Sequence, residues 1–188
     1  MAREALAKVG IDIKGAKVAL QGCGNVGSYA GMYIEEFGAK VVIVGDHTGT
    51  ITNPDGIDMK ALMAYIPTTP NRGIKGFPGA EATDQNVLTA DVDLLMPCAL
   101  ENQLTAENAN DVKAKVVCEG ANGPTTPGAD EIFAQKGITL VPDILANSGG
   151  VTVSYYEWVQ NLQRDSWSFE EVQAKQEKAM KKAFDAIW

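Results

Sequence analysis

The feature that most constrains the fold is a glycine-rich segment, G-C-G-N-V-G at residues 22–27. The short apolar run before it, residues 16–21, is typical of a buried strand. After it, apolar and aromatic residues recur at helical spacing as far as Phe37. A second apolar run over residues 40–45 leads into Asp46. The order is therefore strand, glycine turn, helix, strand and acid.

Each glycine of this turn has its own physical role. Gly22 permits a tight exit from the strand, Gly24 leaves room for a pyrophosphate, and Gly27 lets the helix pack close to the sheet. The phosphates would bind free N–H groups at the helix N-terminus, where the helix dipole favours negative charge. Asp46, nineteen residues after Gly27, lies where a carboxylate can accept hydrogen bonds from the adenosine ribose. The pattern predicts a dinucleotide site; the alternative is a turn in an α/β domain that binds no ligand.

Composition excludes several other classes of protein. The chain has 188 residues, enough for one domain with a sizeable core, and 45% of them are apolar. Sixteen basic and twenty-four acidic residues give a formal charge of −8, and no basic cluster stands out. We therefore expect neither a nucleic acid nor an anionic membrane as partner. No apolar segment has membrane-spanning length, and the N-terminus has no signal-peptide pattern.

Cysteine usage indicates a cytoplasmic protein. The three cysteines are odd in number and lack C-x-x-C spacing, so we interpret Cys23, Cys98 and Cys118 as reduced thiols. Each follows a predicted strand closely, at the edge where open α/β sheets bind ligands. We expect them to be neighbours of a ligand rather than nucleophiles. No residue pattern predicts a metal site.

The rest of the chain alternates strands with helices, which predicts a doubly wound, mainly parallel sheet with helices on both faces. Residues 67–86 are rich in Pro, Gly and Thr and predict a surface excursion. Further strands are expected at residues 48–53, 92–96, 115–118 and 139–141. Helices are expected near residues 3–9, 57–66, 105–112 and 127–135.

The C-terminal tail is predicted to contain two helices. Ser168 and Glu171 form a capping-box pattern that opens the second of them. Each helix carries an apolar stripe, and packing is the default interpretation for both stripes. The first stripe consists of Val151, Tyr155, Trp158, Val159 and Leu162, and the second runs from Phe169 to Ile187.

Five motifs together resemble the coenzyme domain of glutamate dehydrogenases, members of the Glu/Leu/Phe/Val dehydrogenase family. They are G-C-G-N-V-G, G-D-H-T-G-T-I-T-N-P-D-G-I-D, P-C-A-L-E-N-Q-L-T, C-E-G-A-N-G-P-T-T-P and N-S-G-G-V-T-V-S-Y-Y-E-W-V-Q-N, in this order. The resemblance runs from about residue 3 to the C-terminus. It implies a Rossmann-like sheet in which one strand is reversed, and residues 48–53 are the candidate.

The resemblance also implies the cofactor and its contacts. The cofactor would be NAD, with NADP as an alternative because His47, beside Asp46, could partly neutralise a 2′-phosphate. Asp46 would bind the adenosine ribose, and Cys98 and Ala99 would lie near the adenosine half. The pyrophosphate would be held by the glycine turn: Gly22, Cys23, Gly24, Asn25, Val26 and Gly27.

Asn122 and Asn147 would bind the nicotinamide ribose and carboxamide. By the same resemblance, Ser154 would contact the side-chain carboxylate of an amino-acid substrate, and Val151 would line that pocket. Asn147, Val151 and Ser154 would share a helix face if the helix began at Asn147. From the residues alone, the ordinary interpretations are turn asparagines, a core valine and a surface serine.

The family's substrate domain, with its catalytic lysine in a Gly-Gly-x-Lys context, has no counterpart here, because Gly149-Gly150 is followed by Val-Thr-Val. We therefore expect residues 1–188 to be a dinucleotide-binding domain without catalytic residues. The complete enzyme would deaminate L-glutamate oxidatively, and full-length members of the family are homo-oligomers. Two alternatives remain: a stand-alone or engineered dinucleotide-binding module, and a branched-chain or aromatic amino-acid dehydrogenase. The Ser154 hydroxyl favours a polar substrate over the latter.

Overall fold

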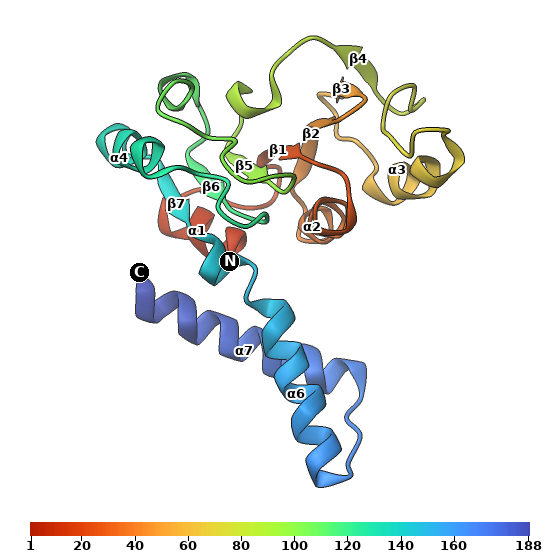
Figure 1. The fold of residues 1–188 in the computed structure, drawn as a ribbon, viewed down its shortest axis with the longest axis vertical. Helices are drawn as coiled ribbons and strands as arrows, with labels where there is room; N and C mark the ends of the chain where they lie inside the picture. The colour runs from red at the N-terminus through yellow and green to blue at the C-terminus, as the bar shows by residue number, and fades with distance from the viewer.

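In the computed structural model, which describes residues 1–188, seven strands form one sheet. They are β1 Lys17–Gln21, β2 Lys40–Asp46, β3 Gly49–Thr52, β4 Glu81–Thr83, β5 Leu94–Pro97, β6 Val116–Cys118 and β7 Thr139–Val141. The spatial order is β4-β3-β2-β1-β5-β6-β7, and β3 pairs antiparallel with both β2 and β4 (Figure 1). The other pairs are parallel. The doubly wound sheet and its reversed strand are thus confirmed.

Helices cover both faces of the sheet, as expected. The α-helices are α1 Ala2–Lys8, α2 Asn25–Glu36, α3 Met59–Tyr65, α4 Pro127–Lys136, α5 Asp143–Ala146, α6 Gly149–Gln163 and α7 Phe169–Ile187. Three short 3₁₀-helices are η1 Ile66–Thr68, η2 Val87–Thr89 and η3 Ala109–Asp111. None of the helices combines the length and the apolar character that a membrane crossing requires.

The core consists of two apolar layers separated by the sheet. In β1, Val18 and Leu20 join the layer that contains residues of α1, α2 and α3, whereas Ala19 joins the layer on the opposite face. The second layer is closed by α4, η2 and η3, with Phe133 fully buried at its centre. Side chains of successive strand residues point to opposite faces, so a strand buried on both sides is apolar throughout. This explains why the predicted strands are continuous apolar runs.

One sequence prediction in the loops is wrong. Residues 105–112 form only the turn of η3, because Asn108 accepts a hydrogen bond from the Thr105 N–H at 2.9 Å and donates to the Gln103 carbonyl at 2.8 Å. Such side-chain bonds to the backbone compete with helix formation. Residues 67–86 run largely over the surface, as expected, and include the short strand β4, which extends the sheet beyond β3.

The helix after the glycine turn packs through its small residues rather than its aromatic ones. Gly27, Ser28, Gly31 and Ile34 are the buried residues of α2. A Cβ at Gly31 would lie 2.7 Å from the terminal methyl of Met59, so the absence of a side chain permits the contact between α2 and α3. Val26, Tyr29 and Tyr33 of α2 are left at the surface, as is Phe37, the residue that follows the helix.

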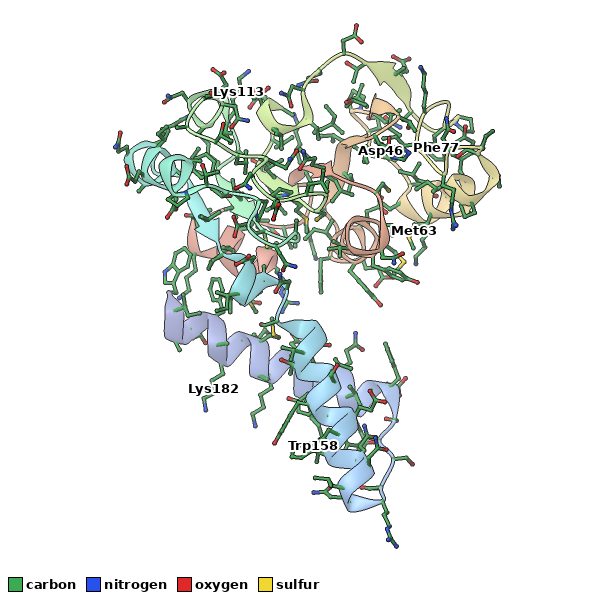
Figure 2. All side chains as sticks on the ribbon, in the orientation of Figure 1. Asp46, Met63, Phe77, Lys113, Trp158 and Lys182 are labelled. Carbon is green, nitrogen blue, oxygen red and sulfur yellow. The ribbon has the colours of Figure 1, made fainter.

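The C-terminal helices form a hairpin that extends away from the sheet domain (Figure 1). Phe184 of α7 is 2% exposed and belongs to the core layer under α1, and Arg3 pairs with Glu177 at 2.8 Å. The stripe predicted to pack on α6 is instead largely exposed, and Figure 2 shows Trp158 on the projecting part of that helix. That prediction is wrong because α6 packs against α7 with its other side, where the Tyr156 hydroxyl donates to the Lys175 carbonyl.

We expect Phe184→Ala to lower the free energy of unfolding by about 3 to 5 kcal/mol, the usual cost of truncating a buried phenylalanine. The matched control is Phe169→Ala, on the same helix. Because the Phe169 side chain is 68% exposed, its removal should lower the free energy of unfolding by well under about 1 kcal/mol. Urea denaturation followed by circular dichroism measures both. Equal effects of the two substitutions would contradict the docking of α7 through Phe184.

Candidate functional site

The glycine turn brings the end of β1, the start of α2 and the loop after β5 into close contact. Gly22 has φ +90°, and a Cβ there would lie 2.9 Å from the backbone of Ala99. A Cβ on Gly27 would overlap the carbonyl oxygen of Gly22. A Cβ on Gly24, by contrast, would meet nothing within 4 Å. Two of the glycines are therefore required by packing, and the third faces open space.

The N-terminus of α2 is available to an anion. Gly24 is the N-cap residue and no side chain caps the helix. An α-helix leaves its first N–H groups without intrahelical partners, and the helix dipole adds partial positive charge there. Asn25, Val26 and Gly27 supply these groups. The first turn of α2 carries no acidic residue that would compete with an anion.

A cleft of about 700 Å³ opens beside this turn, at the carboxyl ends of β1, β2 and β5. Open parallel sheets bind ligands at this edge, and the volume is in the usual range of ligand pockets. The cleft is lined by seven of the residues predicted to hold the cofactor: Gly22, Cys23, Gly24, Asp46, His47, Cys98 and Ala99.

Asp46 lies in the wall of the cleft, but its carboxylate is largely occupied by the protein itself. Oδ1 accepts from the N–H and the hydroxyl of Thr48, at 2.7 and 2.6 Å, and Oδ2 accepts from the N–H of Ile74 at 3.0 Å. The side chain is only 8% exposed. Asp46 therefore holds the loop at residues 69–75 against the end of β2, and only part of its hydrogen-bonding capacity remains for a ribose.

Two basic side chains stand at the same end of the cleft. Arg72, with φ +49°, lines it and makes no ion pair or side-chain hydrogen bond. His47 is 66% exposed and lies 3.8 Å from Asp46 Oδ2. Asp84, on the segment that follows β4, lines the cleft as well. The cleft end nearest β2 is thus of mixed charge.

The three cysteines are buried, which excludes an easily ionised thiol. Burial raises the pKa of Cys23 and of Cys98 to about 12, and the nearby Asp46 carboxylate adds to the rise at Cys23. Burial also raises the pKa of Cys118 to about 11. Because the thiolate is the nucleophilic form, none of the three is poised for covalent catalysis.

Asn122 and Asn147 are brought together, and neither lines the cleft. The Asn147 side-chain amide donates to the Asn122 side-chain carbonyl at 2.8 Å. Asn122 lies in the loop after β6, and Asn147 ends α5. This bond leaves Asn122 Nδ2 as a donor and Asn147 Oδ1 as an acceptor for a ligand.

Val151 and Ser154 lie on α6, and both are exposed. The Ser154 hydroxyl donates only to the Gly150 carbonyl within its own helix, at 3.3 Å. Because α6 begins at Gly149, the condition for a helix face shared with Asn147 is not met. The chain thus presents Val151 and Ser154 to the surface, with no enclosed pocket around them.

The comparisons with known proteins agree with these features. Residues 1–188 match the profile of the Glutamate/Leucine/Phenylalanine/Valine dehydrogenase family. The chain belongs to this family. It is 52% identical to the NAD-specific glutamate dehydrogenase of Clostridioides difficile over 100% of this chain and 45% of that protein. It is 48% identical to the NADP-specific glutamate dehydrogenase A1 of Halobacterium salinarum, over 99% of this chain and 45% of the relative.

Solved structures of glutamate dehydrogenases share the fold. The hetero-hexameric glutamate dehydrogenase of Thermus thermophilus, in a Leu bound form, superposes with a TM-score of 0.89 at 31% identity. That match covers 99% of this chain and 44% of the Thermus chain. The chain spans about 45% of the length of the curated relatives that it matches.

Sequence reasoning missed some residues of this family member's candidate site. Arg72 and Asp84 lie in residues 67–86, a segment that the sequence predicts only as a surface excursion and that has no periodicity to place side chains. Outside the cleft, Glu119 in the loop after β6 is a further charged residue that the motifs do not indicate, and it is 4% exposed. Burial raises the pKa of its carboxyl, although hydrogen bonds such as that from the Asp143 N–H oppose the rise. A charged residue directly after an apolar strand was the available signal.

We expect all three cysteines of the folded chain to resist alkylation by iodoacetamide at pH 8, because burial keeps them protonated and inaccessible. Mass spectrometry of the native chain should show no adduct after a time that labels all three in urea. Rapid labelling of Cys23 in the native chain would contradict this, because Cys23 is the thiol within the glycine turn.

Proposed function

We propose that residues 1–188 form the nicotinamide dinucleotide-binding domain of a glutamate dehydrogenase-like oxidoreductase. The observation that carries the proposal is the uncapped N-terminus of α2, with Gly24 open to the cleft. Pyrophosphate is the part of the cofactor that suits this helix end. Asn25, Val26 and Gly27 would supply the N–H groups, and Ala99 and Cys98 would form the floor.

In the complete enzyme, L-glutamate, water and NAD⁺ would give 2-oxoglutarate, ammonium, NADH and a proton. When bound, the nicotinamide supplies the hydride acceptor for Cα of the amino acid. The residues of this chain bind and orient: the glycine turn holds the phosphates, and Asn122 and Asn147 fix the carboxamide. Ser154 would offer its hydroxyl to the side-chain carboxylate of glutamate, and Val151 would line that pocket. An aliphatic or aromatic substrate would leave the Ser154 hydroxyl unused.

The exposed stripe on α6 supports a partner in the complete protein over a stand-alone module. Large apolar residues gathered on one side of a helix usually mark an interaction surface. We infer that this side packs against the substrate-binding part of the protein, which the relatives' greater length accommodates, and that the complete protein is an oligomer. The stripe residues that are more than half exposed are Val151, Tyr155, Trp158 and Leu162.

We propose NAD(H) as the preferred cofactor, with NADP(H) as a weaker ligand. Asp46 is an acid at the position of the adenosine ribose, and a 2′-phosphate would meet its charge at close range. Arg72 and His47 line the same cleft and would offset part of that repulsion. The three internal hydrogen bonds to Asp46 also reduce its hold on the ribose. We therefore expect the dissociation constant for NADP⁺ to exceed that for NAD⁺ by only about tenfold.

Gly24→Val tests the phosphate turn. The substitution should leave the fold intact, because a Cβ at Gly24 meets nothing within 4 Å, and should abolish NAD⁺ binding by filling the space of the pyrophosphate. Isothermal titration calorimetry measures the binding, and thermal unfolding confirms the fold. A folded Gly24→Val chain that binds NAD⁺ as tightly as the parent would refute the assignment.

Arg72→Ala and Asp46→Ser test the cofactor preference in opposite directions. Arg72→Ala should weaken NADP⁺ binding by about tenfold and leave NAD⁺ binding within about twofold, because only the 2′-phosphate needs the guanidinium. Asp46→Ser should reduce the difference between the dissociation constants for NAD⁺ and NADP⁺, mainly by improving NADP⁺ binding. Equal dissociation constants of the parent for the two cofactors would contradict the proposed preference. Equal losses for both in Arg72→Ala would remove Arg72 from the 2′-phosphate site.

A further inference from the structure

Glu119 is a buried carboxylate with no cation beside it. It is 4% exposed and forms no salt bridge. Its Oε2 accepts a hydrogen bond from the N–H of Asp143, at 2.8 Å, and its own N–H donates to the Val141 carbonyl at 3.1 Å. Burying an unpaired charge is costly, and an apolar residue would fill the same space more cheaply. A buried carboxylate without a cation is therefore expected mainly where function requires it.

The hydrogen bonds continue from Glu119 to the asparagine pair. Asp143 Oδ2 accepts from the N–H of Gly123 at 2.7 Å, and the Asp143 carbonyl accepts from the N–H of Asn147 at 2.9 Å. Asp143 thus contacts both the loop that carries Asn122 and the residue Asn147 itself. The Glu119 carboxylate holds Asp143, the first residue of α5, through the main-chain N–H of Asp143.

This arrangement matters because the two asparagines must act as one unit. Their mutual hydrogen bond leaves one amide donor and one carbonyl acceptor free, and a primary carboxamide requires both. Asn122 and Asn147 come from separate loops and are exposed at the surface. Their relative position therefore depends on the hydrogen bonds that hold the two segments. The Pro97 carbonyl accepts from the N–H groups of Gly120 and Ala121 and so holds the first segment. The carboxylates of Glu119 and Asp143 link the first segment to the second.

We propose that Glu119 is a positioning residue for the nicotinamide end of the cofactor, acting through Asp143 to hold Asn122 and Asn147 in a fixed relative geometry. The proposal rests on the proposed function, since it assumes that a nicotinamide dinucleotide binds. It assigns no contact between Glu119 and the ligand.

The test compares NADH with ADP-ribose, which lacks the nicotinamide, by calorimetric titration of the full chain. The parent should bind NADH more tightly than ADP-ribose. Glu119→Ala should raise the dissociation constant for NADH about five- to tenfold, the effect of about one hydrogen bond, and leave that for ADP-ribose within about twofold. Glu119→Gln keeps an oxygen for the Asp143 N–H and should restore NADH binding. Glu131→Ala, an exposed acid on α4, is the matched control and should change neither.

Four results would overturn the inference. An equal loss of NADH and ADP-ribose binding in Glu119→Ala would show a general structural role, and no loss would show none. If Glu119→Ala does not fold, Glu119→Leu, which fills the same space with an apolar side chain, decides by the same comparison of the NADH and ADP-ribose dissociation constants. A parent that binds ADP-ribose and NADH equally would refute this inference while leaving the dinucleotide site in place. A parent that binds neither would refute the proposed function and this inference with it.

Discussion

The close approach of β1, α2 and the loop after β5 is the constraint on which the candidate site depends. Gly22 and Gly27 have no room for a side chain, because the Ala99 backbone and the Gly22 carbonyl occupy the positions that a Cβ would take. This packing fixes the start of α2 against the end of β1. The N-terminus of α2 is therefore held in a set orientation beside the cleft, and Gly24, which lines the cleft, keeps the space there open.

Two carboxylates, one towards each end of the predicted cofactor path, tie distant loops to this framework. Asp46 accepts from the Ile74 N–H, 28 residues away in sequence, and Glu119 accepts from the Asp143 N–H, 24 residues away. Asp46 binds a backbone donor of an irregular loop, and Glu119 binds the N–H of the first residue of α5. Hydrogen bonds to a charged group are among the stronger ones. The account therefore separates residues that would touch the cofactor from residues that hold the loops in position.

The central strands β1, β2, β5 and β6 were predictable from sequence because they are buried on both faces and are continuous apolar runs. The strands β3 and β4 are largely polar and less buried, and β4 gave no such signal. The glycine turn was predictable because its roles are steric. Helix surfaces were not: α2 packs through Gly31 and leaves Tyr33 at the surface, and Trp158 on α6 faces outward. An apolar stripe shows that a helix has a partner but not which one. Arg72 and Glu119 lie in loops, where position depends on hydrogen bonds to remote residues.

Amide chemical-shift mapping of the labelled chain during titration with NAD⁺ tests the central claim most directly. The account predicts the largest shifts at the N–H groups of Gly24, Asn25 and Val26, because these would bind the pyrophosphate. Smaller shifts should follow at Asn122 and Asn147, and none on the projecting part of α6. A second groove lies between α1, α2 and α7 and is lined by Arg3, Tyr33 and Met180. Shifts confined to that groove, with the glycine turn unchanged, would contradict the account.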